Sequence, residues 1–349
     1  MTSLEVARKE IQTLSPASFA LVMSTGIVSI ASHLLHYKSV SNFLFYLNNI
    51  EYALLMVLFL VRIISFFPLI AADLSSHANG AGFLTITAAS CILGLQYSLM
   101  KQSFSSAVVL WFFALLFWLI FMYSFLISVF VKVQKPSLEE GLNGSWLLLV
   151  VSTQSLSILA NILGPHLPFT PEVSAFIASA AFLLGFLLYV IIIAIIFQRL
   201  IFSPLKAEEF KPPDWIDMGA AAITALAAAT LVNSIKTVTP FNELTSFVKT
   251  ISLLSWTVST WWIPIVFILE IRRHLYQKKS FKYQSAYWGL VFPLGVYTAC
   301  TIRVSQVLPF QYIYPIAEKF IFIAFATWLI IFVAMGVHLI RLFLKANSS

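Results

Sequence analysis

Apolar stretches long enough to cross a lipid bilayer follow one another along nearly the whole chain, and short polar connectors separate them. A spanning helix needs about 20 predominantly apolar residues, and within lipid a helix satisfies its own backbone hydrogen bonds. Prolines mark several connectors, as at Pro136 and Pro212-Pro213. The pattern predicts an all-α integral membrane protein with ten transmembrane helices, at residues 16–36, 42–64, 80–100, 106–130, 145–164, 173–200, 215–236, 245–269, 284–307 and 316–341.

The ten predicted spans form one transmembrane domain over residues 16–341, because no connector is long enough to fold as a second domain. Residues 1–15 precede this domain. In that segment Leu4, Val6 and Ile11 oppose charged neighbours, which fits either a short amphipathic helix on the membrane surface or a solvated tail. Residues 342–349 are predicted to form a short C-terminal tail.

Composition and charge support this class and suggest an orientation. The chain is 60% hydrophobic and 10% charged, whereas soluble domains carry about 25% charged residues. Most Lys and Arg residues fall in connectors on one side of the spans, including Arg272 and Arg273. The positive-inside rule then predicts a multi-pass protein of the cell (plasma or inner) membrane with both termini in the cytoplasm. Its net charge of +7 faces an anionic leaflet, so it does not indicate a nucleic-acid partner.

Odd-numbered and even-numbered spans differ in their residues. The even spans are mostly bulky, whereas the odd spans are rich in small and hydroxyl-bearing residues, although the eighth span is more polar than the other even ones. Small residues at helical spacing occur at close helix contacts, and they also suit a wet interior. We favour odd helices inside, around a pore, and even helices outside. The candidate lining residues are Thr25, Gly26, Ser29, Thr87, Ser90, Gly94, Ser152, Ser155, Thr230, Gly295 and Val296.

The predicted interior is nearly free of charge. Of the 14 acidic residues, only Glu51 lies well within a span. A metal or cation site would need several inward carboxylates, so we expect no metal and no cofactor. A lining of hydroxyl groups and backbone dipoles with basic residues at its mouths suits an anion better than a cation.

The ninth span carries the most specific residues. Phe292 and Arg303 are 11 residues apart, about three helical turns, so both point the same way and lie about 16 Å apart along the axis. Pro293 is expected to bend this helix. A ring at Phe292 could block a pore by its bulk and by dewetting, while Arg303 at the outer mouth would attract anions. The alternatives are a packed core phenylalanine and a snorkelling arginine.

Three segments, in this order along ten spans, carry a family resemblance: Pro16-Ala17-Ser18-Phe19-Ala20-Leu21-Val22-Met23-Ser24-Thr25-Gly26, Ser259-Thr260-Trp261-Trp262-Ile263-Pro264 and Trp288 to Pro293. The chain resembles the tellurite-resistance/dicarboxylate transporter family, which includes bacterial TehA, fungal malate permease and the slow anion channels of plant guard cells. The resemblance implies five helical hairpins in a quasi-fivefold array around a central pore, a homotrimer, and an occluding phenylalanine that matches Phe292. The polar run Ser152-Thr153-Gln154 departs from the family pattern, so the wall of the fifth span is expected to differ.

The sequence therefore predicts transport of small inorganic or carboxylate anions, by a channel or efflux mechanism gated by Phe292. A proton-coupled dicarboxylate carrier of the malate type or a sulfite exporter is the alternative, and Glu51, His33 or Arg303 would have to serve such a carrier. An intramembrane enzyme or sensor is the least favoured hypothesis. The tellurite-resistance label is loose within the family and does not identify the transported ion.

Overall fold

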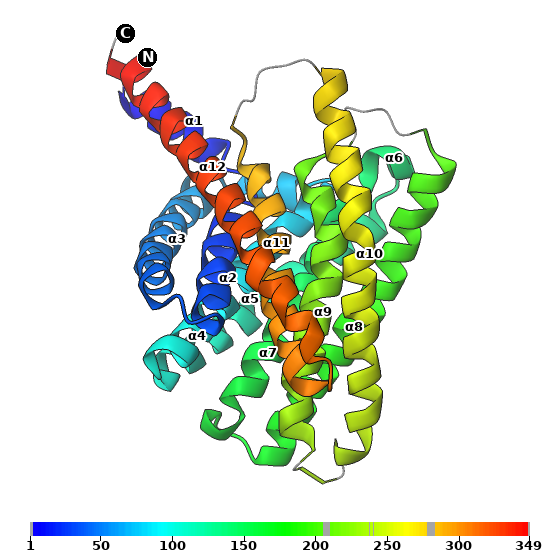
Figure 1. Ribbon diagram of the computed structural model, residues 1–349. Coiled ribbons are helices and arrows are strands. Elements are labelled where there is room, and N and C mark those ends of the chain that lie inside the picture. The colour runs from blue at the N-terminus through cyan, green and yellow to red at the C-terminus, as the bar shows by residue number, and fades with distance from the viewer. Residues whose placement is uncertain (1–2, 205–209, 237, 240, 278–282, 348–349) are drawn as a thin grey trace.

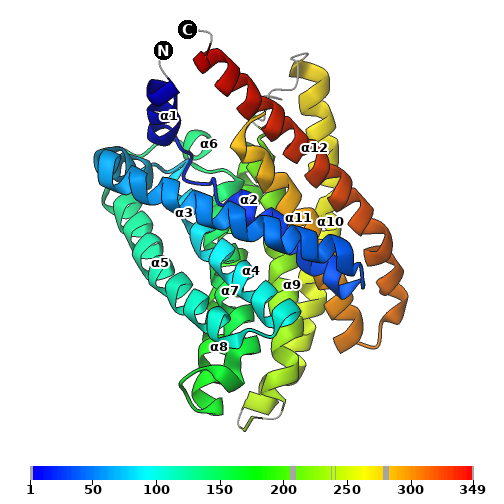
Figure 2. The same ribbon diagram turned by 90° about the vertical axis from the view of Figure 1, so that its left-hand side faces the viewer.

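A computed structural model describes residues 3–204, 210–236, 238–239, 241–277 and 283–347, and every regular element in these ranges is helical. Within these ranges, nine helical segments are long and apolar enough to cross a membrane. The first predicted span corresponds to a shorter apolar helix, α2 (Ala20–Leu34). The all-α membrane class is therefore confirmed, and Figures 1 and 2 show the long helices bundled side by side.

The long helices form five consecutive pairs, each made of a short inner helix and a longer outer helix. The inner helices are α2, α4 (Leu84–Lys101), α7 (Leu148–Leu163), α9 (Ile216–Ile235) and α11 (Trp288–Val307). The outer helices are α3 (Lys38–Leu74), α5 (Phe104–Val131), α8 (Pro171–Phe202), α10 (Thr245–Gln277) and α12 (Tyr314–Asn347). Each inner helix contacts the outer helix that follows it. Short helices in the connectors are α6 (Leu138–Gly141), η3 (Gly164–His166), η5 (Phe241–Leu244) and η7 (Gln311–Ile313).

Burial separates the two sets of helices. In the most apolar stretch of each segment, at least 78% of residues are buried in those that contain α4, α7, α9 and α11, against at most 33% in the outer helices. In α2, every residue from Ala20 to Ser32 is buried. Bulky side chains on the outer helices are left for lipid, and the prediction of odd helices inside and even helices outside is confirmed.

The inner helices contact one another in a closed cycle. α2 contacts α4, α4 contacts α7, α7 contacts α9, α9 contacts α11, and α11 returns to α2. The last contact joins segments that lie far apart in the chain, and the Ser24 hydroxyl donates a hydrogen bond to the Trp288 carbonyl oxygen across it, at 2.8 Å. We call these five helices the inner ring.

The polar residues of α10 face the inner ring. Ser252 donates to the Ala225 carbonyl oxygen at 3.2 Å, and Ser259 donates to the Met218 carbonyl oxygen at 3.0 Å. Both acceptors belong to α9, and both serines are buried. The unusual polarity of the eighth span therefore serves its contact with α9, because buried hydroxyl groups need partners.

Each inner helix begins with a tight turn that the sequence pattern did not predict. The turns are residues 16–19 and the 3₁₀ helices η1 (Gly80–Phe83), η2 (Gly144–Leu147), η4 (Pro212–Trp215) and η6 (Ser285–Tyr287). The 3₁₀ helices contact one another in chain order, and Gly82 of η1 lies against the first turn at Pro16 and Ala17. We call these five turns the collar. They account for the inner helices being shorter than the predicted spans.

A buried carboxylate fastens two turns of the collar. Asp214 of η4 accepts hydrogen bonds from the Gly144 N–H at 2.8 Å and from the Lys211 N–H at 2.6 Å. Gly144 has no room for a side chain, because a Cβ atom there would lie 2.6 Å from Asp214 Cα. This seam of the collar is therefore a direct backbone contact.

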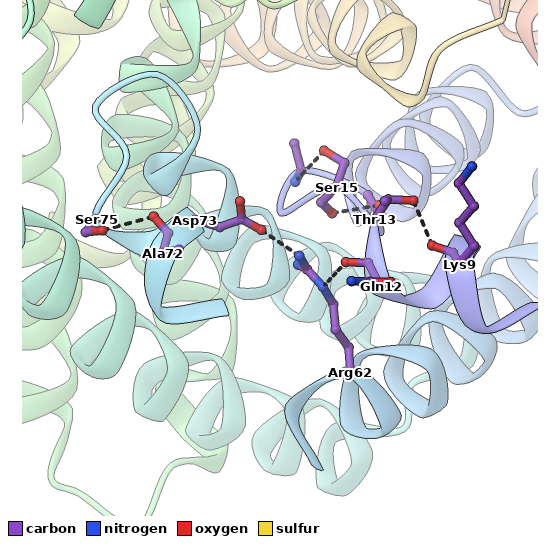
Figure 3. Close-up of polar contacts among 10 residues, drawn as sticks. Lys9, Gln12, Thr13, Ser15, Arg62, Ala72, Asp73 and Ser75 are labelled. Carbon is purple, nitrogen blue, oxygen red and sulfur yellow. Dashed lines mark hydrogen bonds and ion pairs between the residues drawn. The ribbon is translucent and has the colours of Figure 1, made fainter. Parts of the chain in front are cut away.

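The N-terminal segment forms a helix that docks on the bundle. α1 (Ser3–Gln12) contacts α3 and α12, and it lies beside the C-terminal end of α12 in Figures 1 and 2. Arg62 of α3, which is 3% exposed, links α1 to the end of α3. Its guanidinium donates to the Gln12 carbonyl oxygen at 3.3 Å and to Asp73 Oδ2 at 2.6 Å (Figure 3).

The Arg62–Asp73 contact depends on a bend in α3. Phe66 has non-helical backbone angles, with φ −139° and ψ 35°, and Pro68 follows two residues later. Proline lacks a backbone N–H and clashes with the preceding turn, which is the usual cause of such a bend. The predicted second span, 42–64, therefore ends close to the bend, while α3 continues to Leu74.

Replacing Asp73 with Asn is expected to lower the stability of the protein by about 1.5 kcal/mol, since hydrogen bonds to charged groups lie at about that value or above. The buried Arg62 would lose its anionic partner, and α1 would be held less firmly. Thermal unfolding in detergent and trypsin cleavage after Lys9 measure the two effects. Glu139→Gln, at an exposed position on α6, is the matched control. Equal melting temperatures and cleavage rates for both variants would contradict the expected anchoring role.

Candidate functional site

The inner helices carry fully buried hydroxyl groups. Ser152, Ser155 and Thr298 are fully buried and donate to carbonyl oxygens of their own helices, at 3.1, 2.8 and 3.0 Å. Thr87 is equally buried, and its hydroxyl has no hydrogen-bond partner. These groups offer hydroxyl dipoles, and α9 also carries the buried carboxyl group of Asp217 in its first turn.

Several predicted lining residues contact outer helices instead of the ring centre. Thr25 Oγ1 accepts a hydrogen bond from Trp328 Nε1 of α12 at 3.0 Å. Ser29 donates to the Ser41 carbonyl oxygen of α3 at 2.8 Å. Ser90 Oγ lies 2.8 Å from the hydroxyl of Tyr52, also on α3. These contacts give the three residues a role in packing inner helices against outer ones.

The predicted lining glycines lie at seams between helices. A Cβ atom on Gly94 would lie 2.6 Å from Leu159 of α7, and one on Gly295 would lie 2.7 Å from Ile27 of α2. Gly26 faces Ile92 of α4 in the same way. Small residues let backbones approach closely within a membrane, so packing alone accounts for these three positions.

The contacts of α11 define which of its faces is left for the ring centre. Pro293 lies against Gly219 of α9, and Gly295 lies against α2. On the outer side, Thr301 accepts a hydrogen bond from Trp256 Nε1 of α10 at 2.9 Å. α11 runs as a single helix through Pro293.

At about 100° per residue, the remaining face of α11 carries Phe292, Val296 and Arg303. Phe292 is 1% exposed and Val296 is fully buried, while Arg303 is half-buried near the end of the helix. The contacts of Pro293 with α9, of Gly295 with α2 and of Thr301 with α10 lie on other faces of the helix. The face that carries Phe292 lies between the positions of α11 that contact α9 and α2.

A cavity of about 560 Å³ opens at the end of the bundle opposite the collar, where the inner helices end. We call it the vestibule. Its polar lining comes from Asn161, Ser174, Thr230, Asn233, Ser234 and Arg303, and Arg303 is the single charged group among its described lining residues. The charges of Arg303 and of Lys38, the first residue of α3, both reach His33. Two basic side chains therefore lie close together at this end of the inner ring.

Two vestibule residues were absent from the predicted site. Asn161 donates from Nδ2 to the Thr230 carbonyl oxygen at 2.9 Å, and its buried Oδ1 has no hydrogen-bond partner. Asn233 lies on the same wall. Both were visible as polar residues near the ends of apolar spans, but their shared location depends on how α7 and α9 pack together.

The run Ser152-Thr153-Gln154 divides between the inner and outer sides of α7. Thr153 Oγ1 accepts a hydrogen bond from Trp118 Nε1 of α5 at 2.9 Å. Gln154 Nε2 donates to the Phe182 carbonyl oxygen of α8 at 3.2 Å, over Gly185. The polarity that departs from the family pattern is thus largely used in contacts with outer helices. No group of three or more potential metal ligands occurs among the described residues.

Comparison with known proteins identifies the class and then the family. Two uncharacterised transporters of Methanocaldococcus jannaschii are 23% and 24% identical to the chain over 326 residues, which cover 92% of it and 93% and 92% of the relatives. An uncharacterised membrane protein of Mycobacterium tuberculosis is 34% identical over 153 residues, 44% of the chain and 77% of the relative. Residues 13–336 match the model of the voltage-dependent anion channel family. The chain is thus a membrane transport protein, and it belongs to the voltage-dependent anion channel family.

Proposed function

We propose that the chain conducts small anions through the centre of the inner ring, as a channel or passive exporter. In this proposal all ten helices span the membrane as five hairpins in a quasi-fivefold array. The observation that carries it is the closed cycle of buried, charge-poor inner helices leading to a vestibule in which Arg303 is the one charged residue of the described lining. The chain is then a transporter and not an enzyme.

Phe292 is the proposed gate. In this proposal its face of α11, shared with Arg303, is turned inward, which the contacts of Pro293 with α9 and of Gly295 with α2 on either side support. An aromatic ring at a narrow point excludes water as well as ions. The proposed lining is Thr87, Ser152, Ser155, Thr230 and Val296, because the bonds and contacts of Thr25, Gly26, Ser29, Ser90, Gly94 and Gly295 are directed at neighbouring helices.

The membrane potential can drive such transport without a coupling ion. With the cell interior negative, each unit of negative charge gains about 2.3 kcal/mol per 100 mV on leaving. We orient the protein in the cell membrane with the collar and both termini in the cytoplasm, so that the vestibule faces outward. By resemblance, three such chains form a homotrimer with one pore in each.

The competing hypothesis is a proton-coupled carrier for a dicarboxylate such as malate, or a sulfite exporter. Conductance of the purified protein in planar bilayers separates the two. Steady current with a reversal potential set by the anion gradient supports a channel, whereas saturable uptake driven by pH without current supports a carrier. A reversal potential that follows the cation gradient would contradict both. Substitution of chloride by nitrate, sulfite and malate then identifies the permeant anion.

Replacing Arg303 with Ala is expected to reduce anion entry from the vestibule side, because the vestibule loses the single charge of its described lining. Screening limits the reach of a charge to about 10 Å at 0.1 M salt, so the reduction should be larger in dilute salt. Current-voltage curves at two salt concentrations measure it, and Arg303→Lys is the charge-preserving control. Equal currents for the Ala variant and the parent protein at both concentrations would leave Arg303 as an interfacial anchor only.

A further inference from the structure

The contact between α2, α3 and α4 encloses a buried cluster of polar side chains: Thr25, Asn48, Glu51 and Gln96. Asn48 Nδ2 donates to Gln96 Oε1 at 2.7 Å, and this bond leaves Asn48 Oδ1 and Gln96 Nε2 without partners. Neither carboxyl oxygen of Glu51 makes a hydrogen bond of good geometry, and the Thr25 hydroxyl is the polar group with which the carboxyl interacts. We call these four residues the α3 cluster.

No cation neutralises Glu51 within the described part of the chain. Arg62, three turns further along α3, is bonded to Asp73 and Gln12, and Lys101 of α4 reaches Asn42 and Tyr46 near the start of α3. Tyr283 is the titratable side chain that the charge of Glu51 reaches. The elements packed around the cluster carry further titratable or charged groups, among them His33 of α2, Lys38 and Tyr52 of α3, Cys91 and Tyr97 of α4, Tyr123 of α5 and Tyr314, Glu318, Lys319, His338 and Arg341 of α12.

An ionised carboxylate in this position would be expensive, because Glu51 is buried and no cation neutralises it within the described part of the chain, although the Thr25 hydroxyl could donate a hydrogen bond to it. A neutral carboxyl group has one O–H donor and remaining acceptor capacity. Thr25 Oγ1 already accepts from Trp328 Nε1 and has a second lone pair to accept that proton. The geometry of the α3 cluster therefore suits the protonated form of Glu51.

Ionisation would also disturb an inner helix. Gly26 of α2 packs directly against this cluster, and a Cβ atom there would lie 2.8 Å from Asn48 Nδ2. This tight contact leaves no space for water to solvate a charge unless α2 moves away from α3 and α4. A negative charge behind α2 would, in addition, repel an anion inside the ring, because fields are weakly screened in a low-dielectric interior.

We propose that Glu51 is a proton-binding site within the membrane domain, and that the inner ring conducts anions only while its carboxyl group is neutral. The released proton passes to bulk water through the loosened α2–α3 contact, and rebinding restores the packed state. This inference rests on the proposed anion conduction. It adds that anion conduction stops at alkaline pH, a property that anion transport by itself does not require.

Anion current through the purified protein in planar bilayers, measured in symmetrical chloride from pH 5.5 to pH 9.5, tests the proposal. The parent protein should lose current in alkali, by about tenfold for each pH unit beyond the titration of Glu51, as a single titrating group dictates. Glu51→Gln keeps the shape and removes the titration, so its current should vary less than about twofold over the same range. Glu318→Gln, at an exposed acid on α12, should retain the alkaline loss.

A flat pH profile for the parent protein, or the same alkaline loss in Glu51→Gln, would overturn the proposal. So would an alkaline loss that follows sodium concentration instead of pH, because the cluster would then hold a metal cation. If Glu51→Gln does not fold, infrared difference spectra of the parent protein replace it: a protonated carboxyl band that disappears in alkali is required. Absence of anion current even at pH 5.5 would contradict the proposed function itself, whereas pH-independent current would contradict only this inference.

Discussion

Phe292→Ala is expected to raise the steady anion current by at least about tenfold, the effect of lowering a barrier by about 1.4 kcal/mol. The benzyl group of Phe292 is 1% exposed, on the face of α11 that we propose lines the pore. Removing it should widen the proposed constriction and allow water to enter, which removes both a steric and a dewetting barrier. Single-protein and macroscopic currents in planar bilayers measure the change.

Phe125→Ala is the matched control for this experiment. Phe125 is fully buried on the outer helix α5, with its ring 5.1 Å from that of Trp146. The same truncation there should lower stability and leave the current per folded protein unchanged. Equal currents for Phe292→Ala and the parent protein would show that the ring of Phe292 is a packed core residue and not a gate.

Gly144→Ala is expected to destabilise the folded protein by about 1–3 kcal/mol or more, the range for overpacked sites. A Cβ atom at this position would meet the Pro213 carbonyl oxygen and Asp214 Cα, and both are backbone atoms that cannot rotate aside. The added methyl group should therefore separate η2 from η4 and stretch the Asp214–Gly144 hydrogen bond. Thermal unfolding in detergent, with the yield of monodisperse protein, measures the loss.

Gly336→Ala provides the contrast on the same chain. No atom lies within 4 Å of a Cβ placed at Gly336, which sits inside α12. Since Gly is less favourable than Ala by about 1 kcal/mol in a helix interior, this variant should be as stable as the parent protein or slightly more stable. Similar melting temperatures for the two variants would contradict the tight collar seam.

Much of the fold could be predicted from the sequence because the size and polarity of the side chains in each helix indicate whether that helix is buried or faces lipid. Bulky apolar side chains on α5 and α8, such as Phe112 and Leu187, are exposed and suit contact with lipid. The serines, threonines and alanines of α7 and α9 are mostly buried and suit contact between helices. The alternation along the chain therefore indicated which helices lie inside. The eighth span appeared to break it only because Ser252 and Ser259 bond to α9.

The candidate site could be predicted less completely. Helical spacing groups residues that share a face, as predicted for Phe292 and Arg303, but an inner helix has neighbours on several sides. Ser90 and Gly94 lie one turn apart, yet Ser90 contacts Tyr52 of α3 and Gly94 contacts Leu159 of α7. Spacing within one helix does not identify which neighbour a face will meet.

By itself, the sequence determined the membrane class, the inside-outside order and the scarcity of charge, since each follows from the hydrophobicity of single segments. Only the tertiary structure decided the rotation of each inner helix, the collar, the Arg62 anchor and the isolation of Glu51. These features arise from contacts between residues far apart in the chain, as between Ser24 and Trp288. Such contacts depend on the packing of several helices at once, so the sequence pattern of a single helix does not predict them.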